Sequence, residues 1–326
     1  MFPLDNAENY LRTFIPSLER SENTLRWVSG DGISELSLTP THEQTFDGLL
    51  VSEMVTLAHT SPFFANLRPG IIARINTWAT ISSLVPADGS GPARLVAKVG
   101  IFSTDKDAAE RVYAPLLCTE AAINGWHAAR IVRGEFEAHP EQSPLSMTDQ
   151  DPAFDNADFE AIKARTDRVG YVGSLGNLHF TVEFPWEMGA TTNLLTREEF
   201  RETLRGPHGF SEEKLDRMAG KTSLLQIRIG EHPLYGKGVH NTLELPFPPD
   251  DPDTVQMVNA LNAWELSVAD LPPHFGAWCI GNRAPAYVSF IPTQFCVPGL
   301  LHNLITWMAA RHARVRECLT ALRSHH

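Results

Sequence analysis

The sequence predicts an α+β fold of two similar halves, each an antiparallel sheet packed by helices, related by a pseudo-twofold axis. The first observation is a pair of matching segments far apart in the chain, Arg74-Ile75-Asn76-Thr77-Trp78 and Ala260-Leu261-Asn262-Ala263-Trp264. The second is another such pair, Trp126-His127-Ala128-Ala129-Arg130 and Trp307-Met308-Ala309-Ala310-Arg311. Between these marks each copy has an apolar residue before a proline, then a strand-like run, then a proline that opens a helix. A unit of about 100 residues is too long for a solenoid repeat and indicates a duplicated small domain.

The first half alternates strand and helix patterns. Turn residues Ser29-Gly30-Asp31-Gly32 separate two apolar runs, and Ser61-Pro62 has the N-cap and first-turn proline of a helix. Apolar residues then recur every three or four positions as far as Ile81. The expected elements are a helix over 10–18, strands over 24–38 and 46–58, a helix over 61–81, a strand over 94–102 and a helix over about 107–132.

The second half repeats this order. Apolar and polar residues alternate over 178–184, as in a half-buried strand, and Asp251-Pro252 opens a helix in the same way as Ser61-Pro62. The expected elements are strands over 178–184, 223–229 and 239–247, a helix from 252 to 268, strands over 275–280 and 286–291, and a closing helix over about 297–322.

A change in composition marks the domain boundary. Residues 135–160 contain eight carboxylates, three prolines and no Lys or Arg, which is typical of a solvated linker. The predicted organisation is a first repeat over 1–134, this acidic linker over 135–160, and a second repeat over 161–326. The second repeat carries an inserted helical region at about 190–220, with two short charged helices.

Composition excludes several classes of function. The chain has 326 residues, room for about two domains, and 43% of them are hydrophobic, enough for a full core. The formal net charge of −12 disfavours nucleic acid and anionic membrane surfaces, because both require clustered Lys and Arg. No apolar run is long enough to span a membrane, and the N-terminus lacks the pattern of a signal peptide. The four cysteines are scattered, so we expect reduced thiols in a cytoplasmic protein.

The second copy resembles the small α+β domain of type III secretion chaperones and the related YbjN family. The resemblance covers about residues 222–322 and is carried by Asn262-Ala263-Trp264-Glu265-Leu266, Leu271-Pro272-Pro273 and Ala286-Tyr287-Val288-Ser289-Phe290. A weaker match covers residues 10–133. These domains pair as dimers, so the resemblance implies a tandem version fused in one chain. It also implies binding of apolar or extended client segments without catalysis, and it supplies no fixed site residues.

Aromatic residues on or near the expected strands are the candidates for binding a peptide. They are Phe184, Trp186, Phe247, Trp278 and Tyr287. The alternative is that they fill the core between sheet and helices. For the repeated Asn76 and Asn262 we favour hydrogen bonds to backbone over contacts with a partner.

The sequence contains no complete catalytic or metal-binding motif. The histidines fall into no ligand spacing, although His232, His240 and His274 could converge, and no cofactor is expected. Gly173-Ser174-Leu175-Gly176 has the wrong spacing for a nucleophile elbow. The predicted function is therefore a chaperone-like protein that binds a client protein or peptide through apolar grooves, as a monomer or weak homodimer. The alternatives are a hydrolase, in which a Ser, Cys or His meets a carboxylate in the cleft between the halves, and a structural subunit of a larger assembly.

Overall fold

The computed structural model contains helices and two antiparallel sheets, and it describes most of both halves. The described residues are 2–41, 50–86, 92–102, 109–133, 171–175, 179–185, 222–232, 235–247, 249, 252–267, 273–296, 303–313 and 315. The expected linker over 135–160 and the inserted helices within 190–220 lie outside these ranges. None of the helices within the ranges is long and apolar enough to cross a membrane.

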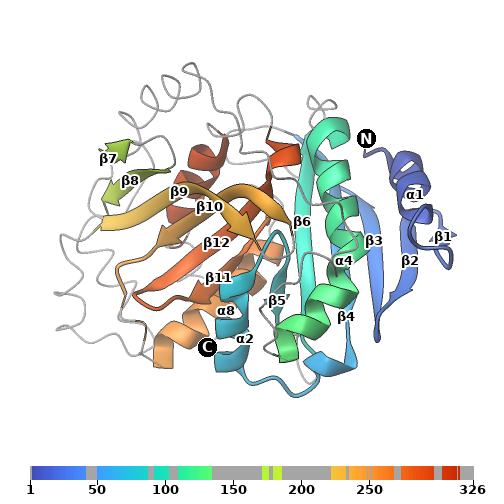
Figure 1. Cartoon of the computed structure of the whole chain (residues 1–326), viewed down its shortest axis with the longest axis horizontal. Coiled ribbons are helices and arrows are strands. Elements are labelled where there is room, and N and C mark those ends of the chain that lie inside the picture. Colours follow the sequence, from blue (N-terminus) through green and yellow to red (C-terminus); the bar gives the residue numbers. More distant parts are fainter. Residues whose placement is uncertain are drawn as a thin grey trace.

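The first half forms a six-stranded sheet in the order β1-β2-β3-β4-β6-β5. Its strands are β1 (Glu19–Ser21), β2 (Thr24–Ser29), β3 (Gly32–Pro40), β4 (Val51–Thr60), β5 (Ser83–Val85) and β6 (Arg94–Phe102). Its helices are α1 (Leu4–Arg12), η1 (Pro62–Phe64), α2 (Pro69–Ile75), η2 (Asn76–Trp78), the π-helical turn η3 (Ala109–Tyr113) and α4 (Ala114–Arg133). The long helix α4 lies across the sheet, in contact with β2, β3, β4 and β6, and α1 packs beside it (Figure 1).

The second half forms a six-stranded sheet in the order β7-β8-β9-β10-β12-β11. Its strands are β7 (Tyr171–Leu175), β8 (His179–Pro185), β9 (Thr222–His232), β10 (Gly236–Glu244), β11 (Ala277–Ile280) and β12 (Pro285–Pro292). Its helices are α8 (Pro252–Ser267), η5 (Thr293–Phe295) and a C-terminal helix over 303–313. The strand order is the same as in the first sheet: four strands run in sequence and the sixth lies between the fourth and the fifth.

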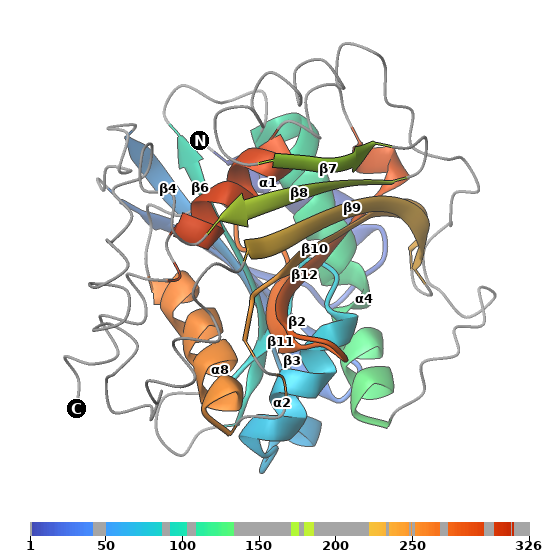
Figure 2. The ribbon, with the colours of Figure 1, turned by 90° about the vertical axis from the view of Figure 1, so that its left-hand side faces the viewer.

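Helices stand at corresponding places in the two halves. α2 precedes the short edge strand β5, and α8 precedes the edge strand β11. These two helices contact one another and lie side by side where the halves meet (Figure 2). One hydrophobic cluster includes buried residues from both sheets, among them Leu57 and Val99 in the first and Val239 and Leu243 in the second. The two sheets therefore share a core.

Two expected helices differ from those observed. The helix expected over 61–81 begins as predicted, with the Ser61 hydroxyl accepting from the Phe63 N–H (3.2 Å), but it is divided into η1, α2 and η2. Pro69 explains the break, because it has no N–H to donate and the residue before it, Arg68, is extended. The first helix lies at Leu4–Arg12 instead of 10–18, since Leu4 and Leu11 form its buried face.

Candidate functional site

Asn76 and Asn262 make the same pair of hydrogen bonds, each to an edge strand of its own half. Asn76 Nδ2 donates to the Leu84 carbonyl (2.9 Å), and its Oδ1 accepts from the Leu84 N–H (2.8 Å). Asn262 bonds the carbonyl and N–H of Trp278 in the same way, at 2.8 Å for both. Each side-chain amide thus makes the two backbone hydrogen bonds that a neighbouring strand would make to one residue of β5 or β11. The expected backbone-bonding role is confirmed for both.

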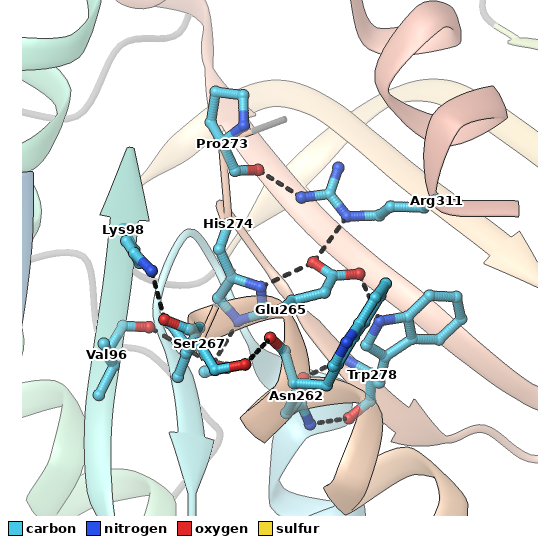
Figure 3. Close-up of polar contacts among 12 residues, drawn as sticks. Val96, Lys98, Asn262, Glu265, Ser267, Pro273, His274, Trp278 and Arg311 are labelled. Carbon is cyan, nitrogen blue, oxygen red and sulfur yellow. Dashed lines mark hydrogen bonds and ion pairs between the residues drawn. The ribbon is translucent and has the colours of Figure 1, made fainter. Parts of the chain in front are cut away.

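Glu265, on α8, is the centre of a buried polar cluster in the second half (Figure 3). Its carboxylate accepts hydrogen bonds from Trp278 Nε1 (2.7 Å), His274 Nδ1 (2.9 Å) and Arg311 Nε (3.1 Å). A carboxylate can only accept, so His274 carries its proton on Nδ1 when the ring is neutral. Glu265 therefore determines the tautomer of His274.

Arg311 supplies the positive charge of this cluster. It comes from the C-terminal helix and is buried, with Nη2 donating to the Pro273 carbonyl. Its guanidinium carbon lies 4.1 Å from the centroid of the Tyr287 ring, a cation–π contact. Glu265 and Arg311 are thus a buried ion pair with further hydrogen bonds to the carboxylate from Trp278 and His274, and such bonds offset part of the cost of burying the two charges.

The other nitrogen of His274 reaches into the first half. Its Nε2 lies 2.7 Å from the hydroxyl of Ser83, on β5, although the two residues are 191 positions apart. Ser83, His274 and Glu265 thus stand in the order hydroxyl, Nε2, Nδ1, carboxylate, as in the triad of serine hydrolases. Ser83 Oγ also has the Val96 carbonyl at 3.4 Å as an alternative acceptor.

Burial and the neighbouring charges together determine the protonation states of His274 and Glu265 in this Ser83–His274–Glu265 relay. Burial would raise the pKa of Glu265, but the Arg311 charge and the donors His274 and Trp278 hold it below its ordinary value. Burial lowers the pKa of His274, against the opposing effect of Glu265, and Arg311 and Lys98 lower it further. The neutral ring accepts from Ser83 and donates to an ionised carboxylate, which is the protonation state of a general base.

A substrate cannot reach the Ser83–His274–Glu265 relay. Ser83 is 0% exposed and His274 is 2% exposed, so neither offers an atom to a substrate. Ser83 also pairs with Val96 as an ordinary strand residue, whereas a nucleophile elbow places its serine on an exposed turn. In this conformation the relay joins the two halves and is not an assembled active site.

A second buried carboxyl lies at the same junction. Glu120, on α4, accepts from the Thr80 hydroxyl (3.1 Å to each oxygen) and from the hydroxyl of Tyr235, which belongs to the second half. Burial raises the pKa of Glu120, although hydrogen bonds from Tyr235, Ser82 and Thr80 oppose the shift. Both buried carboxyls therefore bond residues of segment 80–83, Glu120 directly and Glu265 through His274.

The five aromatic candidates are not surface residues where the structure describes them. Phe184, Phe247, Trp278 and Tyr287 are all buried in the main core cluster, and Trp278 packs edge-on against Tyr287 with ring centroids 5.3 Å apart. These four side chains fill the core, as in the alternative interpretation of the sequence. Trp186 lies outside the described residues. None of the four offers a surface to a peptide.

The histidines do not converge. His232 and His240 flank Phe290, with ring centroids 5.0 and 4.7 Å from it, whereas His274 lies in the Glu265 cluster. Within the part of the chain that the structure describes, no group of His, Cys, Asp and Glu side chains could hold a metal ion.

Sequence reasoning did not bring Ser83, Glu265, His274 and Arg311 together. A signal for two of them was present, because Glu265 directly follows Asn262-Ala263-Trp264 of the first matching pair and Arg311 ends Trp307-Met308-Ala309-Ala310-Arg311 of the second. A charged residue beside an apolar repeat is a candidate for a buried pair. Ser83 carried no such signal.

Comparisons with known proteins gave no relative: no family model, curated protein or solved structure matches the chain. The function therefore has to be argued from the side chains themselves.

Removing the Asn262 amide should destabilise the protein. Asn262→Ala leaves the buried N–H and carbonyl of Trp278 without partners, at about 1–3 kcal/mol for each group. We expect the free energy of unfolding, measured by urea titration, to fall by about 2–6 kcal/mol. The control Asn9→Ala, on the exposed face of α1, should change it by less than about 0.5 kcal/mol. Equal unfolding midpoints for Asn262→Ala and wild type would show that the amide pair contributes nothing.

The raised pKa of Glu120 predicts a loss of stability at higher pH. The stabilisation that a carboxyl with a raised pKa provides is complete below the ordinary value of 4.5 and is lost as pH rises through the folded-state pKa. Glu120→Gln does not titrate, so its unfolding free energy should vary less between pH 5 and pH 9 than that of wild type. Parallel pH profiles for the two proteins would contradict this account of Glu120.

Proposed function

We propose that the protein is a chaperone-like binding protein that recognises an apolar segment of a partner protein without covalent chemistry. The proposal includes a tandem, pseudo-twofold pair of domains of the YbjN and type III secretion chaperone type, acting as a monomer. The repeated strand order and the matching bonds of Asn76 and Asn262 support this duplication. The free thiols of Cys118, Cys279 and Cys296 are in keeping with a reducing compartment such as the cytoplasm.

An exposed aromatic pair at the C-terminal end of α1 is the observation that carries the proposal. Tyr10 is 40% exposed and Phe14, just beyond the helix, is 48% exposed, and their rings meet edge to face with centroids 5.2 Å apart. Aromatic side chains spaced by four residues are typical anchors between a helix and a partner. The aromatic candidates named from the sequence are buried, so Tyr10 and Phe14 take their place as the expected contact residues.

The helix that presents this pair is held in place before any partner binds. Arg20 pairs with Asp5 (2.6 Å) and Glu8 (2.5 Å), and Arg12 pairs with Glu8 (2.7 Å). The inner face of α1 packs on α4. A pre-ordered surface loses less conformational entropy on binding, so its apolar area contributes more to affinity. The net charge of −12 favours basic or neutral clients.

Removing the aromatic pair should weaken client binding. We expect the wild-type chain to suppress the light scattering of chemically reduced insulin, a model unfolded client. In Tyr10→Ser/Phe14→Ser the concentration needed should rise about tenfold or more, since truncating a central aromatic contact costs about 1–2 kcal/mol. The control Val28→Thr changes a residue that is 67% exposed on β2, and it should behave as wild type. Equal suppression by all three proteins would place binding elsewhere, and no suppression by wild type would contradict the proposal.

A hydrolase is the second candidate, because Ser83, His274 and Glu265 have the atom order of a catalytic triad. In that case Ser83 Oγ would attack an ester carbonyl while His274 Nε2 takes its proton and returns it to the leaving alcohol. The burial of Ser83 argues against this in the observed conformation.

A fluorophosphonate probe separates the two candidates. With Ser83 buried, we expect no adduct on this residue by peptide mass spectrometry at pH 7.5. An adduct on Ser83 in wild type, absent in Ser83→Ala and slowed in His274→Gln, would replace the binding proposal with a hydrolase.

A further inference from the structure

Backbone hydrogen bonds join the two halves along what we call the seam, formed by residues 80–83 and Lys98 of the first half with residues 274–276 and Phe290 of the second. The His274 N–H donates to the Lys98 carbonyl (2.7 Å), and the Lys98 N–H donates back (3.4 Å). The Gly276 N–H donates to the Ile81 carbonyl (3.0 Å) and the Phe290 N–H to the Thr80 carbonyl (3.2 Å). Residues 80–81 thus bond the residue just before β11 and one residue of β12.

The His274 ring lies within this seam. Its two nitrogens bond opposite halves, Nε2 to Ser83 at 2.7 Å and Nδ1 to Glu265 at 2.9 Å. We propose that the seam is a proton-controlled clamp, closed while His274 is neutral and loosened when the ring gains a proton, so that acidification parts the two sheets between β5 and β11. This inference concerns regulation and stands apart from the proposed client binding.

Hydrogen bonding alone would not open the clamp. A protonated His274 would donate from Nε2, and Ser83 Oγ could accept while turning its own proton towards the Val96 carbonyl at 3.4 Å. The polar contacts can therefore be re-formed within the seam. What changes on protonation is the charge.

The charged groups around His274 decide the effect. Glu265 on α8 is the one acidic partner among the described contacts of the ring, and its charge is already matched by Arg311 from the C-terminal helix. Lys98 on β6 is close enough to lower the pKa of His274, and its Nζ donates to the Leu266 carbonyl. Tyr287 on β12 lies edge-on, with ring centroids 6.1 Å apart, and adds no negative charge. A proton on His274 is thus a second buried positive charge without a carboxylate of its own.

The sign of the pH effect follows from the lowered pKa of His274, caused chiefly by burial. A parted seam exposes the ring, which then titrates near its ordinary value of 6.5. The stabilisation of the closed seam is therefore complete above that value and is lost as pH falls towards the lowered pKa. Within this window the equilibrium for opening shifts about tenfold per pH unit.

Hydrogen–deuterium exchange of the full chain tests the clamp. After correction for intrinsic rates, the amides of His274, Gly276 and Phe290 should lose protection as pH falls below 6.5, by up to about tenfold per pH unit. Amides of the β2–β3 pairing, such as Leu25 and Leu36, should keep theirs. In His274→Gln the seam amides should no longer lose protection as pH falls.

A matched control is His59→Gln, since His59 is also buried, with its pKa lowered to about 4, but it bonds Ser34 within the first sheet. This variant should keep the seam response. Unchanged seam protection in wild type, or an equal pH response in His274→Gln, would overturn the clamp. Should His274→Gln not fold, the NMR titration of His274 in wild type decides: proton uptake without loss of seam protection also overturns it.

Discussion

A buried carboxylate must be surrounded by donors, and Glu265 meets this requirement by fixing the elements around it. Its three partners come from three different places: Trp278 from β11, Arg311 from the C-terminal helix, and His274 from the stretch just before β11. Moving any one of them would leave a charge or a donor unpaired in the core, at a cost of several kcal/mol. Glu265 therefore couples α8, β11 and the closing helix into one unit.

This arrangement favours specificity over stability. A buried ion pair gains little net free energy compared with well-packed apolar side chains, because desolvation offsets the attraction. Apolar side chains, however, would tolerate small shifts of one half against the other, whereas the hydrogen bond between Ser83 and His274 requires one relative placement of the two halves. Polar contacts across an otherwise apolar junction thus define how the two halves fit together. They also make the junction sensitive to a change of charge on His274.

Local signals predicted local structure well. The turn at Ser29–Gly32, the cap at Ser61 and the strand at 94–102 are all set by neighbouring residues, and they were found where expected. The backbone role of Asn76 and Asn262 was also foreseeable, because a buried amide has to find partners. Pro69 is a local signal for a helix boundary, but the apolar periodicity continues past it and predicts one uninterrupted helix.

Long-range contacts could not be predicted in this way. Ser83 and His274 are ordinary residues in their local segments, and nothing in either segment indicates that they meet. Whether Phe184, Trp278 and Tyr287 face the core or a partner likewise depends on which elements cover each strand. The periodicity of apolar residues shows which face of a strand or helix is buried, but not which element packs against that face.

The two halves differ where they meet, and the difference has an electrostatic consequence. Three residues after the shared asparagine, the first half has Ala79 and the second has Glu265. The first half provides its buried carboxyl from α4 instead, as Glu120, which accepts hydrogen bonds from the hydroxyl groups of Thr80 and Tyr235. Arg311 keeps Glu265 ionised, whereas burial raises the pKa of Glu120. Protonation of His274 therefore weakens the junction as pH falls, and ionisation of Glu120 weakens it as pH rises, so the two groups give pH responses of opposite sign.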